Sequence, residues 1–242
     1  DLTVCFDKAD QSPYLYVDEQ GVWRGAALDL ARAAMEQAGL RVEWLPRPWL
    51  RCLQEVSDPE PGQGIRLALY GSLSLERSKV FLASLPLHLV QGGVWYSRRK
   101  FAAAPLEQMT DLVNYRLCGV HGHNYSWLQE FTSAKVDAGA FTLSAALQKL
   151  KLGRCDLLLS SKEHVEGAER MQQLEIGPDL IFAAYPGRPP LPQHLLLPRN
   201  RPESLDLKAR IDRSLMLLHR NGSADHIYER YLPGGTGLAR MP

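Results

Sequence analysis

Long apolar runs, nucleotide-binding loops and an excess of charge of either sign are all missing from this chain. No apolar run approaches the roughly 20 residues that span a bilayer. The longest, such as residues 157–159 and 195–197, are flanked by polar residues, as is typical of buried strands. The 28 basic residues balance the 27 acidic ones, which gives no reason to expect a nucleic acid partner. Without a Walker loop, a GxGxxG motif or a GxSxG elbow, we expect no cofactor and no serine hydrolase.

Cysteine is scarce, and only Cys5, Cys52, Cys118 and Cys155 are present. None of them forms a CxxC pair, so neither a zinc site nor a thioredoxin-like site is indicated. An even number permits two disulfides in an exported protein, in any of three pairings. Four buried free thiols would fit the same count, because cysteine is often simply buried.

Strand-like and helix-like periodicity alternate along the chain, which predicts parallel α/β sheets. A first block contains strands at residues 2–6, 42–45 and 65–70 and helices at residues 28–38 and from Trp49 onwards. A second block contains strands at residues 115–120 and 156–159 and helices at residues 125–131 and 143–152. Two helices near residues 202–218 and 224–231 follow, and extended segments at residues 87–96 and 194–197 join the blocks.

Two blocks joined by two crossings predict two lobes with a cleft between them. We expect lobe 1 to comprise residues 1–93 and 196–232, lobe 2 residues 94–195, and residues 233–242 to form a flexible tail. Ligands of open α/β sheets bind beyond the carboxyl ends of the strands, so the cleft is the expected ligand site.

Short motifs occur in a fixed order from residue 2 to about residue 232. They are Ser12-Pro13-Tyr14 and the segments at residues 21–30, 71–77, 84–86, 116–122, 153–157 and 221–231. In this order they resemble the type II periplasmic solute-binding proteins of amino-acid-binding family 3, and residues 48–52 resemble a PWxRC-containing subgroup. The resemblance implies a Venus flytrap fold, with two α/β lobes, two hinge crossings and a small polar ligand, carboxylate-bearing or amino-acid-like, in the cleft.

The resemblance also implies which residues of lobe 1 contact the ligand. Tyr14 and Trp49 match two aromatics that sandwich the ligand side chain in the family, and Tyr70 and Ser72 fall in the polar strand-end motif. Arg77 matches the arginine that forks onto the ligand carboxylate. Ordinary packing of the two rings, and a salt bridge for the arginine, are the alternatives.

In lobe 2 the expected contacts are His123, Asn124 and Ser161. The first two lie where a helix begins, which favours anions, although Asn124 could act only as a helix cap. Ser161 replaces the family aspartate that holds the ligand α-amino group, and a neutral hydroxyl cannot offset a buried ammonium. This departure argues against an ordinary free α-amino acid.

Other functions are less well supported by the residues. His121 and His123, with His164, fall short of a recognisable zinc pattern, so we expect no metal. A cleft enzyme resembling cyclohexadienyl dehydratase, and the sensing domain of a membrane receptor, share the expected fold and stay open as alternatives. We expect a binding protein without catalytic residues.

The resemblance implies a periplasmic monomer whose partners are its small ligand and either an ABC transporter permease or a membrane receptor. The chain starts at Asp1, as a mature protein does after removal of its signal peptide, or as a trimmed domain does. Cys5 lies on the first strand and Cys52 on the helix expected beside it, while Cys118 and Cys155 lie at neighbouring strands of the second block. We therefore predict the disulfides Cys5–Cys52 and Cys118–Cys155.

Overall fold

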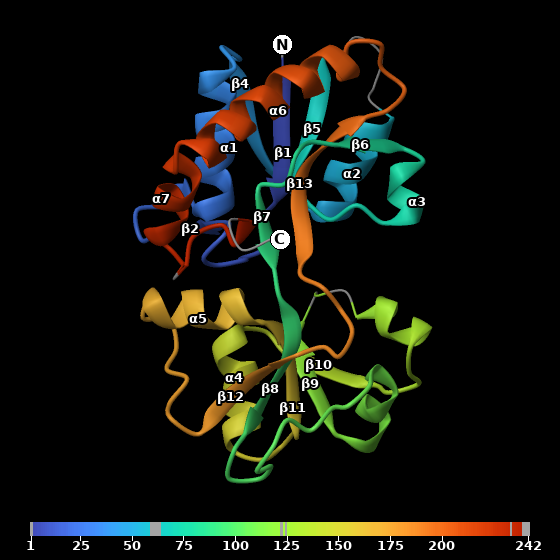
Figure 1. The fold of residues 1–242 in the computed structure, drawn as a ribbon, viewed down its shortest axis with the longest axis vertical. Coiled ribbons are helices and arrows are strands. Elements are labelled where there is room, and N and C mark those ends of the chain that lie inside the picture. The colour runs from blue at the N-terminus through green and yellow to red at the C-terminus, as the bar shows by residue number, and fades with distance from the viewer. Residues whose placement is uncertain (1, 59–63, 122, 124, 233, 239–242) are drawn as a thin grey trace. The chain divides into compact units, whose positions relative to one another are not determined.

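The structure is a computed structural model that describes residues 2–58, 64–121, 123, 125–232 and 234–238. The chain divides into two compact α/β units (Figure 1). Unit 1 comprises Asp1–Leu89 and Leu191–Pro242, and unit 2 comprises Val90–Pro190. The chain therefore passes from one unit to the other twice.

Unit 1 is built on a six-stranded sheet in the order β4-β1-β5-β13-β6, with β7 paired to β13. Strands β4, β1 and β5 are parallel, whereas β13 runs antiparallel to β5 and to β6. A separate small pair is formed by β2 and β3. The strands of this unit are β1 (Leu2–Asp7), β2 (Tyr16–Val17), β3 (Trp23–Arg24), β4 (Val42–Arg47), β5 (Ile65–Gly71), β6 (Phe81–Ala83), β7 (His88–Val90) and β13 (Leu191–Pro198).

Helices cover both faces of this sheet, because successive strand residues point to opposite sides. Cys5, Ala68 and Leu196 lie on the face that packs against Cys52 and Val56 of α2. Helices α1, α6 and α7 contact one another, and α1 and α6 also contact the sheet (Figure 1). The helices are α1 (Ala26–Gln37), α2 (Trp49–Ser57), α3 (Leu75–Ser78), α6 (Ser204–Arg220) and α7 (Ser223–Glu229).

Unit 2 is built on a five-stranded sheet in the order β10-β9-β11-β8-β12. Strands β10, β9 and β11 are parallel, β8 runs antiparallel to β11, and β12 runs antiparallel to β8. The strands are β8 (Gly92–Ser97), β9 (Leu117–Val120), β10 (Val136–Ala140), β11 (Leu157–Ser161) and β12 (Leu180–Ala184). The helices are α4 (Leu143–Lys151) and α5 (Lys162–Arg170), with 3-10 helices η1 (Met109–Asn114) and η2 (Ser126–Glu130).

The leucine run of β11 shows why this sheet is buried on both faces. Leu158 points into a cluster that also holds Leu147 of α4, whereas Leu157 and Leu159 point into the opposite cluster with Leu128 of η2. A strand covered on both sides loses the alternation of polar and apolar residues and becomes continuously apolar. No helix in the described part of the chain is long and apolar enough to cross a membrane.

Both predicted disulfides are confirmed. Cys5–Cys52 joins β1 to α2 with a Cα–Cα distance of 5.7 Å, and Cys118–Cys155 joins β9 to the segment before β11 with a Cα–Cα distance of 5.8 Å. No described cysteine is free. Each disulfide lies within one unit.

Two segments differ from their sequence-based expectations. The helix expected at residues 125–131 is a 3-10 helix, in which Leu128 N–H donates to Tyr125 O. In the tail expected to be flexible, Thr236 is buried, and its N–H and hydroxyl both donate to Asp225 Oδ1, at 2.7 and 2.8 Å. The rest of that tail includes residues 233 and 239–242, which lie outside the described residues.

Candidate ligand-binding site

Three neighbouring parallel strands of unit 1 bring predicted contacts to one sheet edge. Tyr14 follows β1, Trp49 opens α2 just after β4, and Ser72 follows β5. The carboxyl ends of parallel neighbours lie at the same edge, which is where α/β sheets bind ligands. The predicted contacts of unit 1, far apart in the sequence, therefore gather in one region.

Arg77 is held in this region by two of the other predicted residues. Its Nη1 donates to Ser72 O at 2.9 Å and lies 3.4 Å from Ser72 Oγ, and its guanidinium carbon lies 5.7 Å from the centroid of the Trp49 ring. Ser74 caps α3 by accepting the Arg77 N–H at 3.2 Å, which fixes the backbone.

The charge of Arg77 has no acidic partner among the described residues, where its polar contacts are to Ser72 and Ser74. The side chain is half-buried, and burial lowers the pKa of its guanidinium from the ordinary value. An arginine stays protonated even so, so this region presents a partly desolvated positive charge.

Tyr14 is buried rather than open to solvent, with 1% of its surface exposed. Its ring stacks on Tyr70 with centroids 5.0 Å apart, and Tyr70 is only partly buried. The backbone of Tyr14 is fixed by α1, because its carbonyl accepts the Ala27 N–H at 3.2 Å. Gly25 permits this approach: its φ is 132°, and a Cβ there would lie 2.2 Å from Tyr14 O.

In unit 2 the predicted residues also lie at carboxyl strand ends, but their roles differ. Ser161 ends β11 and caps α5, where its hydroxyl accepts the His164 N–H at 3.1 Å. His123 follows β9, and its ring lies 5.9 Å from the His164 ring at an angle of 26°. Asn124, also predicted, lies outside the described residues.

Sequence reasoning missed Glu163, an acid on the first turn of α5. Its Oε2 accepts the Gln91 N–H at 2.9 Å, and burial raises the pKa of its carboxyl group above the ordinary value. Glu163 comes two residues after the end of β11. The sequence could have indicated it only if the helix α5 had been predicted there. No group of three or more His, Cys, Asp or Glu that could hold a metal ion exists among the described residues.

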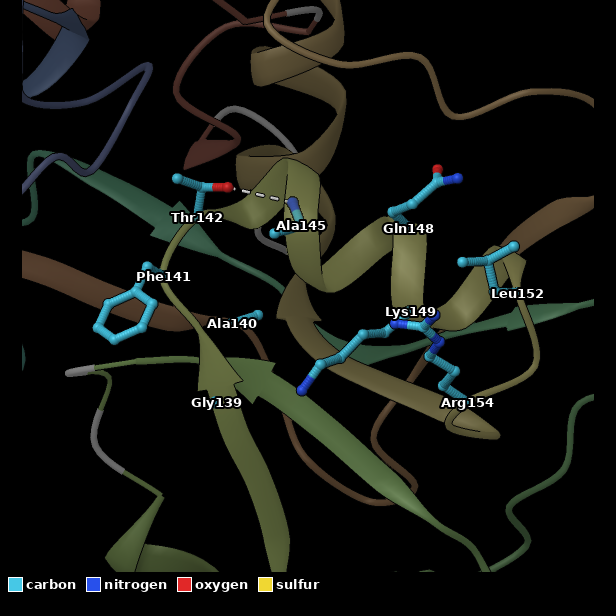
Figure 2. A pocket seen from close by; sticks show the side chains of 9 residues that line it. All are labelled: Gly139, Ala140, Phe141, Thr142, Ala145, Gln148, Lys149, Leu152 and Arg154. Atoms are coloured by element: carbon cyan, nitrogen blue, oxygen red, sulfur yellow. Dashed lines mark hydrogen bonds between the residues drawn. The ribbon is translucent and has the colours of Figure 1, made fainter.

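A hollow of about 470 Å³ on unit 2 is separate from all the predicted contacts. It is lined by residues 139–142 and by side chains on and just after α4, including Lys149 and Arg154 (Figure 2). Figure 2 also shows the hydrogen bond that Ala145 N donates to Thr142 Oγ1 at the start of the helix. None of the predicted ligand contacts lines this hollow.

The chain belongs to the bacterial extracellular solute-binding proteins, family 3, whose family model matches residues 2–234. The family predicted from the motifs is thereby confirmed. No curated protein sequence matches the chain significantly.

Solved structures of binding proteins and of a sensor share the fold. The arginine-, lysine- and histidine-binding protein ArtJ of Geobacillus stearothermophilus has a TM-score of 0.72 at 19% identity, with 99% of this chain and 98% of that chain covered. A histidine kinase sensor domain similar to periplasmic binding proteins has a TM-score of 0.71 at 19% identity, with 96% of each chain covered. An ancestral amino-acid-binding protein, described as a precursor of cyclohexadienyl dehydratase, has a TM-score of 0.69 at 17% identity, with 95% and 94% covered.

These likenesses confirm the predicted fold class, the type II periplasmic-binding-protein fold. By its family the chain is a solute-binding protein.

Proposed function

We propose that this chain acts outside the cytoplasm and binds a small polar ligand that carries a carboxylate, as an amino acid does. The observation that carries the proposal is the half-buried guanidinium of Arg77, which Ser72 and Trp49 orient and which has no acidic partner among the described residues. A guanidinium offers two parallel charged hydrogen bonds to a carboxylate, and a partly dehydrated site strengthens them.

The other predicted residues enter the proposal with distinct roles. Tyr70 offers a partly buried ring at the end of β5, two residues before Ser72, and Tyr14 stacks on that ring from the protein interior. For unit 2 we extend the proposal to His123, Asn124 and Ser161 as polar contacts. Because Ser161 is neutral, a ligand without a free α-ammonium group suits this chain better than an ordinary amino acid.

Binding, with transport or sensing as its purpose, is proposed over catalysis. In unit 1, Trp49, Tyr70, Ser72 and Arg77 include no carboxylic acid, and in unit 2 the carboxylate of Glu163 is occupied by the Gln91 N–H at 2.9 Å. The related structures include both a binding protein and a kinase sensor domain, so the proposed partner is an ABC transporter permease or a membrane receptor. Two buried disulfides support a periplasmic location, because such bonds persist in oxidising compartments.

A thermal-shift screen tests the ligand class. The panel contains L-arginine, L-histidine, L-glutamine, small dicarboxylates and, as ligands without a carboxylate, polyamines. A true ligand raises the unfolding temperature increasingly with its concentration, because it binds the folded state alone. We expect this rise for at least one carboxylate compound and its loss in Arg77→Ala.

The matched control is Arg188→Ala. Arg188 also lies over aromatic rings, 4.7 Å from the Phe131 centroid, but it lies outside the predicted contacts. Its removal should leave the ligand-dependent rise unchanged. A rise with polyamines alone, or an undiminished rise in Arg77→Ala, would contradict the carboxylate proposal.

A further inference from the structure

A compact group of four rings inside unit 1 adjoins the candidate site. The rings of Tyr14, Tyr70 and His88 lie at mutual centroid distances of 4.8, 5.0 and 5.3 Å and are near-parallel, with interplanar angles of 15° to 29°. Tyr228 of α7 contacts the same histidine at 5.0 Å. Tyr14, His88 and Tyr228 are buried, and only Tyr70 is partly exposed. Tyr70 is therefore the ring through which this group reaches the surface.

The backbone of Tyr70 has an unusual conformation that needs support from its surroundings. Its φ is 70°, in the left-handed region that bulky residues seldom adopt. The pairing of β5 with β13 shifts register here, because His194 pairs with Gly71 while Leu195 pairs with Leu69. Tyr70 is thus the extra residue of a β-bulge, and bulges re-aim side chains beside functional sites.

The position of Tyr70 has consequences for the rest of the site. Gly71 comes next, where an added Cβ would lie 3.4 Å from Cη2 of Trp49. Ser72 follows, whose carbonyl and hydroxyl hold Arg77. The bulge at Tyr70 therefore directly precedes the two residues that contact Trp49 and Arg77.

His88 combines a flat stacking surface with a polar anchor. Its Nδ1 lies 2.5 Å from the hydroxyl oxygen of Tyr228, a hydrogen bond that links β7 to α7. Burial, with smaller effects of His194 and His219, lowers the pKa of its imidazole to about 3, so the ring is neutral. A neutral ring stacks on tyrosine without the desolvation cost of a buried charge.

We propose that His88 is a positioning residue of the binding site: anchored by Tyr228, it holds the Tyr70 ring at the bulge and thereby sets the affinity of a site that it does not touch. This inference rests on the proposed function, because it assigns Tyr70 to the ligand site. It goes further because it adds His88 of β7 and Tyr228 of α7 to the residues that determine the affinity.

The binding test uses succinate, a small dicarboxylate without an α-ammonium group, as the probe in calorimetric titrations at a temperature where all variants are folded. His88→Leu removes the stacking ring and should weaken binding about 2- to 10-fold, the range expected for one lost aromatic pair. The double variant His88→Phe/Tyr228→Phe keeps both rings and leaves neither polar group unpaired, so it should recover most of the affinity. His219→Leu, which removes another partly buried imidazole of unit 1, is the matched control and should bind as the wild type does.

A double-mutant cycle separates positioning from general destabilisation. In a Tyr70→Leu background, His88→Leu should still lower stability but should weaken succinate binding no further, because the ring through which it acts is gone. Equal weakening of binding in both backgrounds would overturn the proposal.

A measurement without ligand keeps this inference apart from the proposed function. The protein is labelled with 3-fluorotyrosine at its 9 tyrosines, and the Tyr70 fluorine resonance is assigned as the one lost in Tyr70→Phe. His88→Leu should broaden that resonance, because the Tyr70 ring loses its support. The chemical shift changes in any case when a neighbouring ring is removed, so the line width is the readout. The double Phe variant should restore the width, and the resonance of Tyr115 in unit 2 should keep its width. An unchanged width of the Tyr70 resonance in His88→Leu would refute the positioning role even if succinate binds. A broadened resonance in a protein that does not bind succinate would support the positioning role and count only against the proposed ligand class.

Discussion

The guanidinium of Arg77 is oriented by contacts within unit 1. Ser72 O accepts from one nitrogen at 2.9 Å and the Trp49 ring lies 5.7 Å from the guanidinium carbon, so the remaining donors are available to the proposed carboxylate. Preorganisation of this kind raises affinity because less side-chain entropy is lost on binding. The identity of the side chain should therefore matter as much as its charge.

Arg77→Lys tests this point. Losing one member of a buried charged pair costs about 30-fold to several-thousand-fold in affinity, as expected for Arg77→Ala. Lysine should recover only part of that loss, because a point charge cannot reproduce the two parallel hydrogen bonds. Calorimetric titration of the best carboxylate from the screen measures both variants. A lysine variant that binds as tightly as the wild type would show that charge alone is required.

Ser161 is the residue whose replacement should change ligand preference. Its hydroxyl caps α5, and aspartate is an equally good capping residue, so Ser161→Asp should not unfold the helix. We expect this variant to bind a free amino acid more tightly and its deaminated analogue more weakly, because a carboxylate offsets an ammonium and repels an anion. Parallel titrations with the two compounds measure the difference. Equal changes for both would show that Ser161 does not face the α-position of the ligand.

Among the helices and strands, the sequence predicted those in which apolar residues recur at regular intervals. Helix α1 and strands β1, β4 and β5 were found because small and aliphatic residues recur at helical or strand spacing and glycines mark the ends. Helix α5 was missed because few of its residues are apolar and Gly167 interrupts them. Strand β12 was missed because its short apolar run, LIFAA, lacks the alternation that separates a strand from a helix.

The candidate site divides in the same way. The places of Trp49, Ser72 and Arg77 near the ends of parallel strands could be predicted because each belongs to a local motif, while their contact with a ligand stays a prediction. The contacts of His88 with Tyr70 and Tyr228 could not be predicted, since these residues meet only through tertiary packing of β5, β7 and α7. Local sequence carries no signal for a contact between segments so far apart.

The disulfide Cys5–Cys52 ties the helix that carries Trp49 to the sheet of unit 1. Trp49 opens α2, and Cys52, one turn further along, is bonded to β1, which lies between β4 and β5. Replacing both cysteines by alanine should lower the free energy of unfolding by about 2–4 kcal/mol, because the open chain gains conformational freedom in the unfolded state.

Urea denaturation under non-reducing conditions measures this loss, and Cys118→Ala/Cys155→Ala is the matched control. Its loop is of similar length, with a sequence separation of 37 against 47, so its stability loss should be similar. The Cys5/Cys52 variant should also weaken binding more than the control, because Cys52 is on the same helix as Trp49, whereas Cys118 and Cys155 lie towards the amino ends of β9 and β11, away from the ends that carry His123 and Ser161. Weakening of equal size in both variants would mean that binding follows stability alone.

At the scale of the whole molecule, buried histidines link folding to pH. Burial lowers the pKa of His88 to about 3, and burial also lowers the pKa values of His194 and His219. In the unfolded chain a histidine titrates near pH 6.5. Between these values the unfolded state binds more protons than the folded state, so stability falls as the pH decreases. The full contribution of these residues is therefore present above about pH 6.5 and is lost towards pH 3.

His88 should dominate this acid sensitivity, because its pKa has the largest displacement of the three. A single histidine that must stay neutral in the fold contributes a slope of about 1.4 kcal/mol per pH unit inside its titration window. Urea denaturation of the wild type from pH 7.5 to 4.5 should show this slope, and His88→Phe/Tyr228→Phe should be flatter by about that amount, since phenylalanine takes up no proton. The control His226→Gln replaces an exposed histidine of α7 and should keep the slope of the wild type. Parallel curves for the wild type and the double Phe variant would mean that His88 takes up its proton in the folded protein, which would contradict the neutral, buried ring on which the packing of Tyr70 depends.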